Sequence, residues 1–329
     1  MRIVSLLPSA TELVYALGLG DRLVGRSHEC DYPPEVARLP ALTGSLVPGG
    51  HCGAELDALV SRAAHEHRSL YRLDCAALQR LQPDLILTQE LCEVCAVAYD
   101  EVEKAARSLR ASPGGASAAR IVSLEPMSLD DVLAQLHVVA RAVVEAGGGE
   151  PVGALKARAA EVERALRERL EAVRRRAADL PAPRVLCLEW LDPPWCAGHW
   201  VPEMVRMAGG ADELGVPAGP SRRMAWSEVL EYRPDVVVLM PCGYDLAGTL
   251  AEYDRVRQGG APGERGGALP DGWQDLPAVR AGRVYAVNAS AYFNRPGPRV
   301  VDGVEILAQI LHPDIFGNSR MGRDWAPAP

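Results

Sequence analysis

Short apolar runs alternate with longer amphipathic stretches along the whole chain. Seven runs are short and apolar enough to form buried strands: residues 2–7, 22–25, 84–88, 120–124, 184–188, 235–240 and 283–287. Between them, apolar residues recur at spacings of three and four, which is the period of a helix with one buried face. Strands that alternate with helices form parallel sheets covered by helices, so the pattern predicts the α/β fold class.

One phrase occurs twice and organises the chain. Leu81-Gln82-Pro83-Asp84-Leu85-Ile86-Leu87 returns as Tyr232-Arg233-Pro234-Asp235-Val236-Val237-Val238-Leu239. Each copy ends a short amphipathic helix, turns at Pro-Asp and enters an apolar strand. Two similar α/β halves predict two Rossmann-like lobes with parallel sheets and a ligand cleft between the lobes.

The region between the two halves contains helical patterns and no strand signal. Residues 129–146 form one pattern, and residues 152–178 form a second that would be about 40 Å long as one helix. The second pattern is amphipathic, as expected for a solvated brace. We therefore expect an N-terminal α/β lobe at 1–126, a helical linker with a long spanning helix at 127–181, and a C-terminal α/β lobe at 182–329.

The composition is that of a soluble globular protein, with 48% hydrophobic residues, 24% charged residues and a net charge of −8. No basic block appears outside one helix face, so nucleic acid is not an expected partner. No run approaches the roughly 18 uninterrupted apolar residues of a membrane span. The first residues pass directly into a strand without a leader pattern. This predicts a cytoplasmic protein as written, or a periplasmic or otherwise extracytoplasmic one if the true start lies upstream.

Polar and aromatic residues follow nearly every predicted strand. Because parallel α/β sheets bind ligands outside the carboxyl ends of their strands, these residues are the candidate ligand-binding set. They are Pro8, Ser9, His28, Glu29, Tyr32 and Glu90 in the first half, and Trp190, Trp195, His199, Tyr244, Tyr292 and Arg295 in the second. Ser9 is also expected to cap a helix that runs to Leu17. No catalytic residue is predicted, since nucleotide-binding and nucleophile-elbow motifs do not occur.

Five of the eight cysteines also fall at these strand ends: Cys30, Cys92, Cys95, Cys196 and Cys242. The Cys92-x-x-Cys95 spacing suits two thiolates on one metal ion, one reactive thiolate at a helix start, or two thiols packed in a core. With His28, Cys30 and Cys242 as neighbours, a metal site that would hold zinc or an iron–sulfur cluster is one candidate, and packed thiols or direct contact of the thiols with the ligand are the alternatives.

Two histidines share this region. His28 is a candidate ligand for a metal ion or for the central metal of a macrocycle, with a loop histidine bonded to backbone as the alternative. Cys196 and His199 also have ligand-like spacing. Because Trp195 and Trp200 flank them, a hydrophobic wall is the favoured interpretation.

The chain as a whole resembles the class III periplasmic binding proteins, the vitamin B12 and iron–siderophore binders of ABC importers. The opening from Arg2 to Glu12, the stretch from Ala16 to Gly20 and both Pro-Asp strands are similar to that family. So are Trp273-Gln274 through Gly282-Arg283-Val284-Tyr285, and Gly297-Pro298-Arg299 before the last helix. The resemblance covers nearly the whole chain, and its nearest branch is the cobalamin-binding one.

The resemblance implies two lobes joined by one long helix, a small hinge motion and a large flat ligand clamped by aromatic walls. It points to Trp190, Trp195 and Tyr244 for such a wall, with Pro8 and Ser9 from the first turn. Cobalamin or a related corrinoid is the implied ligand, without enzymatic activity, and an ABC permease is the implied partner. Two alternatives are open: a siderophore or haem binder, and a cytosolic metal- or iron–sulfur protein or enzyme that uses Cys30, Cys92 and Cys95.

Overall fold

The structure is a computed structural model that describes residues 1–47, 53–65, 70–90, 99–110, 119–149, 152–259 and 268–329. The chain divides into two compact units. Unit 1 comprises Met1–Gly50, Leu59–Pro126 and Asp130–Ala165, and unit 2 comprises His51–Ala58, Met127–Leu129 and Leu166–Pro329. The predicted Cys92-x-x-Cys95 motif lies outside the described residues.

Unit 1 is built on a four-stranded parallel sheet with the order β2-β1-β5-β6. Its strands are β1 (Ile3–Ser5), β2 (Leu23–Arg26), β5 (Leu85–Thr88) and β6 (Arg120–Ser123). Apolar side chains such as Val4, Leu78 and Ile86 form its buried core, because the central strands are covered on both faces. The parallel sheet confirms the predicted α/β fold class.

The helices in residues 1–149 are α1 (Pro8–Ala16), α2 (Gly53–His65), α3 (Cys75–Leu81), α4 (Tyr99–Arg110) and α5 (Leu129–Glu145). The start of α2, up to Ala58, belongs to unit 2. Two 3₁₀ turns, η1 (Gly20–Arg22) and η2 (Pro34–Arg38), flank β2. A short antiparallel pair, β3 (Thr43–Ser45) and β4 (Tyr71–Leu73), was not predicted from the pattern. Its strands of three residues are too short to show an alternation of apolar and polar positions.

The expected cap of the first helix is wrong. The helix begins two residues earlier than a cap at Ser9 would require: Pro8 is its first residue, and Leu7 is the N-cap residue without a side-chain hydrogen bond. Proline suits the first helical position because it lacks the N–H that would be unsatisfied there. Ser9 is therefore a buried residue inside the first turn.

A 26-residue helix, α6 (Val152–Ala177), begins among the residues of unit 1 and ends among those of unit 2. It confirms the predicted long helix between the two halves. Its buried residues, Leu155, Ala159, Leu166, Leu170, Val173 and Ala177, recur at helical spacing.

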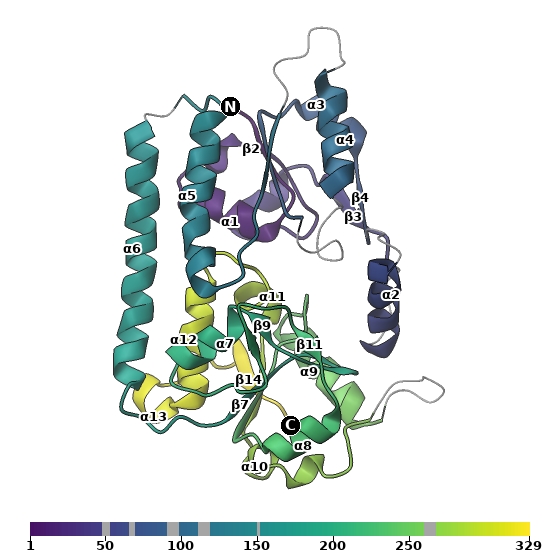
Figure 1. Cartoon of the computed structure of the whole chain (residues 1–329), viewed down its shortest axis with the longest axis vertical. Helices are drawn as coiled ribbons and strands as arrows, with labels where there is room; N and C mark the ends of the chain where they lie inside the picture. Colours follow the sequence, from purple (N-terminus) through teal and green to yellow (C-terminus); the bar gives the residue numbers. More distant parts are fainter. Residues whose placement is uncertain (48–52, 66–69, 91–98, 111–118, 150–151, 260–267) are drawn as a thin grey trace. The chain divides into compact units, whose positions relative to one another are not determined.

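Unit 2 is built on a six-stranded sheet with the order β11-β8-β7-β12-β13-β14. Its central strands β7 (Val185–Leu191), β12 (Val236–Leu239) and β13 (Val284–Val287) are parallel. Figure 1 labels β7 of this sheet. The outer strands β8 (Pro194–Cys196), β11 (Arg222–Arg223) and β14 (Trp325–Pro327) are antiparallel to their neighbours. A separate parallel pair consists of β9 (Gly198–His199) and β10 (Val216–Pro217).

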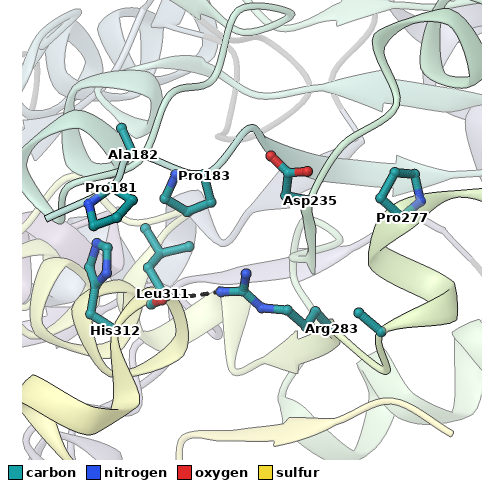
Figure 2. Close-up of a pocket in the computed structure, with 9 residues that line it drawn as sticks. Pro181, Ala182, Pro183, Asp235, Pro277, Arg283, Leu311 and His312 are labelled. Atoms are coloured by element: carbon teal, nitrogen blue, oxygen red, sulfur yellow. Dashed lines mark hydrogen bonds between the residues drawn. The ribbon is translucent and has the colours of Figure 1, made fainter.

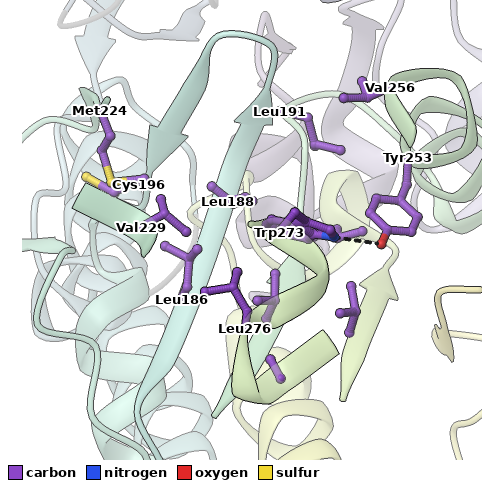
Figure 3. Packing of buried hydrophobic residues seen from close by; sticks show 14 residues of the cluster. Leu186, Leu188, Leu191, Cys196, Met224, Val229, Tyr253, Val256, Trp273 and Leu276 are labelled. Atoms are coloured by element: carbon purple, nitrogen blue, oxygen red, sulfur yellow. Dashed lines mark hydrogen bonds between the residues drawn. The ribbon is translucent and has the colours of Figure 1, made fainter. Parts of the chain in front are cut away.

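The helices of unit 2 beyond α6 are α7 (Val201–Met207), α8 (Trp226–Tyr232), α9 (Leu246–Arg257), α10 (Pro277–Arg280), α11 (Ala289–Tyr292), α12 (Val300–Leu311) and α13 (Pro313–Phe316), with a 3₁₀ turn η3 (Trp273–Asp275). One apolar core lies between the sheet and several of these helices, with Trp273 at its centre (Figure 3). The indole N–H of Trp273 donates to the Tyr253 hydroxyl at 3.4 Å, so this large side chain is buried with its polar group paired.

Candidate functional site

The carboxyl ends of the unit 1 strands carry the first predicted group. His28 follows β2, and both its backbone N–H and its ring Nδ1 lie within hydrogen-bond distance of the Thr43 hydroxyl, at 3.0 and 2.6 Å. Its ring is 5.4 Å from that of Tyr71, whose hydroxyl donates to Glu29 at 3.1 Å. The antiparallel strands β3 and β4 therefore place Thr43 and Tyr71, which were not among the predicted residues, beside His28 and Glu29.

The remaining unit 1 residues lie in different surroundings. Pro8 and Ser9 belong to the first turn of α1, and Tyr32 is exposed. Glu90 is exposed after β5, and its backbone N–H donates to the Glu125 carboxylate at 2.6 Å. Glu125 is thus held at the same edge of the sheet.

Cys30 is a buried thiol that is 2% exposed. The Thr11 hydroxyl lies 3.1 Å from its sulfur and 2.9 Å from the Ser5 hydroxyl. The other predicted metal ligands are Cys242, which is exposed in unit 2, and Cys92 and Cys95, which lie outside the described residues. Among the residues that the structure describes, no group of three or more His, Cys, Asp or Glu side chains could hold a metal ion.

The carboxyl edge of the unit 2 sheet carries an aromatic pair. Trp190 near the end of β7 contacts Tyr244 after β12 edge to face, with ring centroids 5.8 Å apart and an interplanar angle of 74°. Tyr244 is fixed because Asp245 caps α9 through a 2.7 Å bond from Gly248 N–H, and because the Tyr244 carbonyl accepts the Ser290 N–H. The structure thus brings together Trp190 and Tyr244, and the third aromatic residue that the family resemblance implied for a wall, Trp195, is paired with Trp190 across β7 and β8.

Both tryptophans of this edge bond to the first turn of α2. The indole N–H of Trp190 lies 3.1 Å from the carbonyls of Gly53 and Asp192, and that of Trp195 lies 3.1 Å from Asp57 Oδ1. Gly53 and Asp57 were not among the predicted residues. No sequence signal could have found them, since they are 137 and 138 positions away from their partners.

Directly before Trp190 in β7 lies a buried carboxyl group that was not among the predicted binding residues. Glu189 occupies an irregular position in the pairing of β7 with β8. Its carboxylate accepts a hydrogen bond from the Ser221 hydroxyl and a 3.4 Å bond from Gly198 N–H, and its carbonyl accepts the Cys242 N–H at 3.1 Å. Burial raises the pKa of Glu189 to about 7 against the opposing effect of these bonds. Through its side chain and its backbone carbonyl, this one residue links the segments that carry His199 and Tyr244.

Asp212 is a second buried acid in this unit. Burial raises its pKa to about 7, although the N–H groups of Gly215 and Leu214 lower it. Its Oδ2 atom is buried without a hydrogen-bond partner. Together with Glu189 it forms the acidic interior of this part of unit 2.

The other predicted residues of unit 2 take mainly structural contacts. His199 has a left-handed backbone (φ 53) and its ring lies 5.5 Å from that of Trp200, while burial lowers its pKa. Cys196 is fully buried in the apolar core. The Tyr292 hydroxyl donates to Asp324 at 3.0 Å, and Arg295 is partly buried in the loop that follows.

A pocket of about 490 Å³ lies at the opposite edge of the unit 2 sheet, where the parallel strands begin (Figure 2). Its wall includes Asp235 and Arg283. Asp235 is paired with Arg184, and Arg283 donates to the carbonyl of Leu311 at 3.1 Å. These polar groups join loop and helix ends to the sheet, so the pocket is distinct from the predicted carboxyl edge.

None of the helices within the described ranges is long and apolar enough to cross a membrane. An uncharacterised ABC transporter substrate-binding lipoprotein of Bacillus subtilis is 24% identical over 327 residues, which cover 96% of this chain and 81% of the relative. A vitamin B12-binding protein of Vibrio cholerae is 23% identical over 321 residues, which cover 94% and 88%.

The fold itself has counterparts among solved structures. A periplasmic haem-binding protein of Roseiflexus sp. RS-1 superposes with a TM-score of 0.63 at 23% identity, covering 96% of this chain and 98% of that one. The family model described as periplasmic binding protein matches residues 3–291. The chain therefore belongs to the periplasmic binding protein family and is a substrate-binding protein of the ABC-importer type.

Proposed function

We propose that the protein binds cobalamin or a related corrinoid and delivers it to an ABC permease. The observation that carries the proposal is the edge-on contact of Trp190 with Tyr244 at the carboxyl edge of the unit 2 sheet. Rigid aromatic rings bury a large apolar area at a small loss of side-chain entropy, which suits the face of a flat macrocycle. The vitamin B12-binding relative supports this choice, because its similarity extends over 94% of the chain.

The charges around this aromatic edge favour a corrinoid over haem. Asp57 and Asp192 lie beside the two tryptophans, with Arg223 close to Asp57. Corrinoids carry neutral amide groups at their periphery, and these can donate hydrogen bonds to carboxylates. Haem carries propionate anions instead, which the carboxylates of this edge would repel.

A haem-type ligand is the second candidate, and His28 favours it. The Nδ1 atom of this imidazole contacts Thr43, and the ring lies against Tyr71. Histidine and tyrosine are both axial ligands of haem iron in proteins. The same imidazole could also ligate the cobalt of a corrinoid, so the two candidates must be separated by direct binding.

Titration of the purified protein with cyanocobalamin and with haemin separates the candidates. We expect calorimetric binding of cyanocobalamin with a Kd in the micromolar range or tighter, and at least tenfold weaker binding of haemin. No heat and no absorbance change with cyanocobalamin up to high micromolar concentrations would overturn the proposal. Aquocobalamin, whose water ligand is exchangeable, tests His28: a spectral shift that His28→Ala abolishes would identify the imidazole as a cobalt ligand.

The proposed role places the protein outside the cytoplasm. The cytoplasmic expectation has no support among the relatives, one of which is described as a lipoprotein and another as periplasmic. An extracytoplasmic location, given above as the alternative, agrees with import. Fractionation of the native producing cells, with a cytoplasmic enzyme as marker, tests this: recovery of the protein with the cytoplasmic marker alone would contradict it.

A further inference from the structure

The first turn of α2 holds both tryptophans of the aromatic edge. An indole N–H is a donor only, so each ring is oriented by the acceptor that it finds. The indole N–H of Trp190 donates to two carbonyl oxygens, those of Gly53 and Asp192, at 3.1 Å each. Trp195 has the carboxylate of Asp57 at 3.1 Å. Two acceptors four residues apart in one helical turn thus fix two rings that lie on neighbouring strands, β7 and β8.

The backbone at Gly53 lies close to two charged side chains of α9. A Cβ atom at this position would lie 2.5 Å from Glu252 Oε1 and 2.9 Å from Arg255 Nη2. Glu252 and Arg255 form an ion pair of 2.8 Å, with side chains that are 8% and 19% exposed. A methyl group at this position would force the ends of these two side chains to move, so glycine lets the Gly53 carbonyl reach Trp190 without disturbing the ion pair.

Asp57 is suited to hold an indole. Burial raises the pKa of its carboxyl group, and the Trp195 hydrogen bond and the positive charge of Arg223 act in the opposite direction. Asp192 also faces it and raises the pKa further. The indole N–H of Trp195 and the charge of Arg223 therefore favour the ionised form of the Asp57 carboxyl group, and the charge of Asp192 disfavours it.

We propose that residues 53–58 form part of the ligand wall of unit 2, in which Asp57 positions the indole of Trp195 and the Gly53 carbonyl positions that of Trp190 against a flat metal-chelating macrocycle. The inference rests on the proposed function and extends it, since it assigns a wall segment that no strand end supplies. Asp57 acts through Trp195 and is thus a positioning residue.

Two substitutions at Asp57 separate positioning from charge. Asp57→Ala removes the acceptor, and we expect cyanocobalamin binding to weaken by about tenfold, which is typical of a lost charge-assisted hydrogen bond. Asp57→Asn keeps an acceptor oxygen and loses the charge, and we expect it to recover most of that loss. Unchanged or tighter binding by Asp57→Ala would overturn the inference, because the turn would then be irrelevant to the ligand or would compete with it.

A second measurement needs no ligand. The chain has six tryptophans, so incorporation of 5-fluorotryptophan gives a resolvable set of ¹⁹F resonances, in which Trp195→Phe identifies one and Trp190→Phe another. In the ligand-free protein, we expect Asp57→Ala to shift the Trp195 resonance and Asp57→Asn to shift it less. A Trp195 resonance that Asp57→Ala leaves in place would overturn the inference. If that resonance moves while wild-type protein binds no cyanocobalamin, the ligand assignment is wrong and the positioning contact stands.

Two glycines provide a matched pair. Gly53→Ala forces a methyl group against the enclosed ion pair, and we expect it to shift the Trp190 resonance and weaken cyanocobalamin binding at least fivefold. Gly153→Ala adds a methyl group in α6 where nothing lies within 4 Å, so affinity should stay within twofold of wild type. Circular dichroism verifies that both variants fold. Equal affinities for the two folded variants would contradict the role of Gly53.

Discussion

The carboxylate of Asp235 accepts a hydrogen bond from the backbone N–H of Arg184 at 2.9 Å. Asp84 does the same for Arg2 in unit 1, at 2.7 Å. In each case the residue two positions earlier ends a helix in the left-handed region, at φ 41 for Gln82 and φ 51 for Arg233. The repeated sequence motif therefore forms the same local structure twice. In each copy, hydrogen bonds of one aspartate connect the end of a helix and the start of the next strand to the first strand of the unit.

The hydrogen bonds that the Asp235 carboxylate accepts from Arg184 predict a loss of stability when this acceptor is removed. Asp235→Ala leaves the Arg184 N–H and guanidinium without this partner, so we expect the free energy of unfolding to fall by about 1–2 kcal/mol in a urea titration. Asp235→Asn keeps one acceptor and should lose less. Asp275, whose exposed ion pair with Arg280 lies at the surface, is the control, and Asp275→Ala should lose no more than about 0.5 kcal/mol. Equal losses of unfolding free energy for the two alanine variants would contradict a structural role of the contact between Asp235 and Arg184.

Local patterns explain why the sheets and long helices could be predicted from the sequence. The Pro-Asp phrase marks a turn into a strand, and the α6 pattern extends over several helical turns. Strand direction predicts which edge of each parallel sheet carries the candidate binding residues, and Trp190 and Tyr244 do meet at that edge. The contribution of α2 could not be predicted, because the bonds of Gly53 and Asp57 join residues more than 130 positions apart. The burial of Glu189 could not be predicted, because a single acidic residue at the end of an apolar strand carries no periodic signal and its partner Ser221 is distant in the sequence.

The metal hypothesis for the cysteines is testable at Cys30. Its thiol is buried beside Thr11, so we expect Cys30→Ala to leave the zinc and iron content of the purified protein unchanged and to destabilise it by about 1 kcal/mol. Elemental analysis of anaerobically purified wild-type and variant protein measures the first effect. Stoichiometric metal in the wild type that disappears in Cys30→Ala would establish the cysteine site. Cys242→Ser, at an exposed position, is the companion variant.

The raised pKa of Glu189 predicts that stability falls as pH rises. The folded protein holds this proton up to pH of about 7, whereas an unfolded glutamate loses it near pH 4.3, so the folded state binds more protons in between. Stability due to this group is complete below pH 4.3 and is lost as pH approaches 7. We therefore expect wild-type protein to be more stable in urea at pH 5.5 than at pH 8.

Substitution of Glu189 by glutamine tests the origin of that pH dependence. Asp212, with a pKa also near 7, faces Glu189, as do the thiols of Cys187 and Cys196, whose pKa values burial raises. Glu189→Gln mimics the protonated side chain and should lose a substantial part of the difference between pH 5.5 and 8, while the Asp212 contribution is retained. A pH dependence identical to that of the wild type would assign the whole effect to Asp212.

The aromatic contact predicts different effects for two substitutions of Tyr244. Tyr244→Phe keeps the ring that meets Trp190 edge to face, so cyanocobalamin binding should stay within about threefold of wild type. Tyr244→Ala removes the ring, which loses both the contact with Trp190 and the area offered to the macrocycle, and we expect at least tenfold weaker binding. Tyr285, whose ring contacts Trp325 with an interplanar angle of 79° in the antiparallel edge pair β13–β14, provides the control. Because Tyr285→Ala removes a similar aromatic pair elsewhere in the same sheet, it should lower stability and leave affinity unchanged. Weaker binding by both alanine variants would show that affinity follows the general stability of unit 2 and not the wall formed by Trp190 and Tyr244.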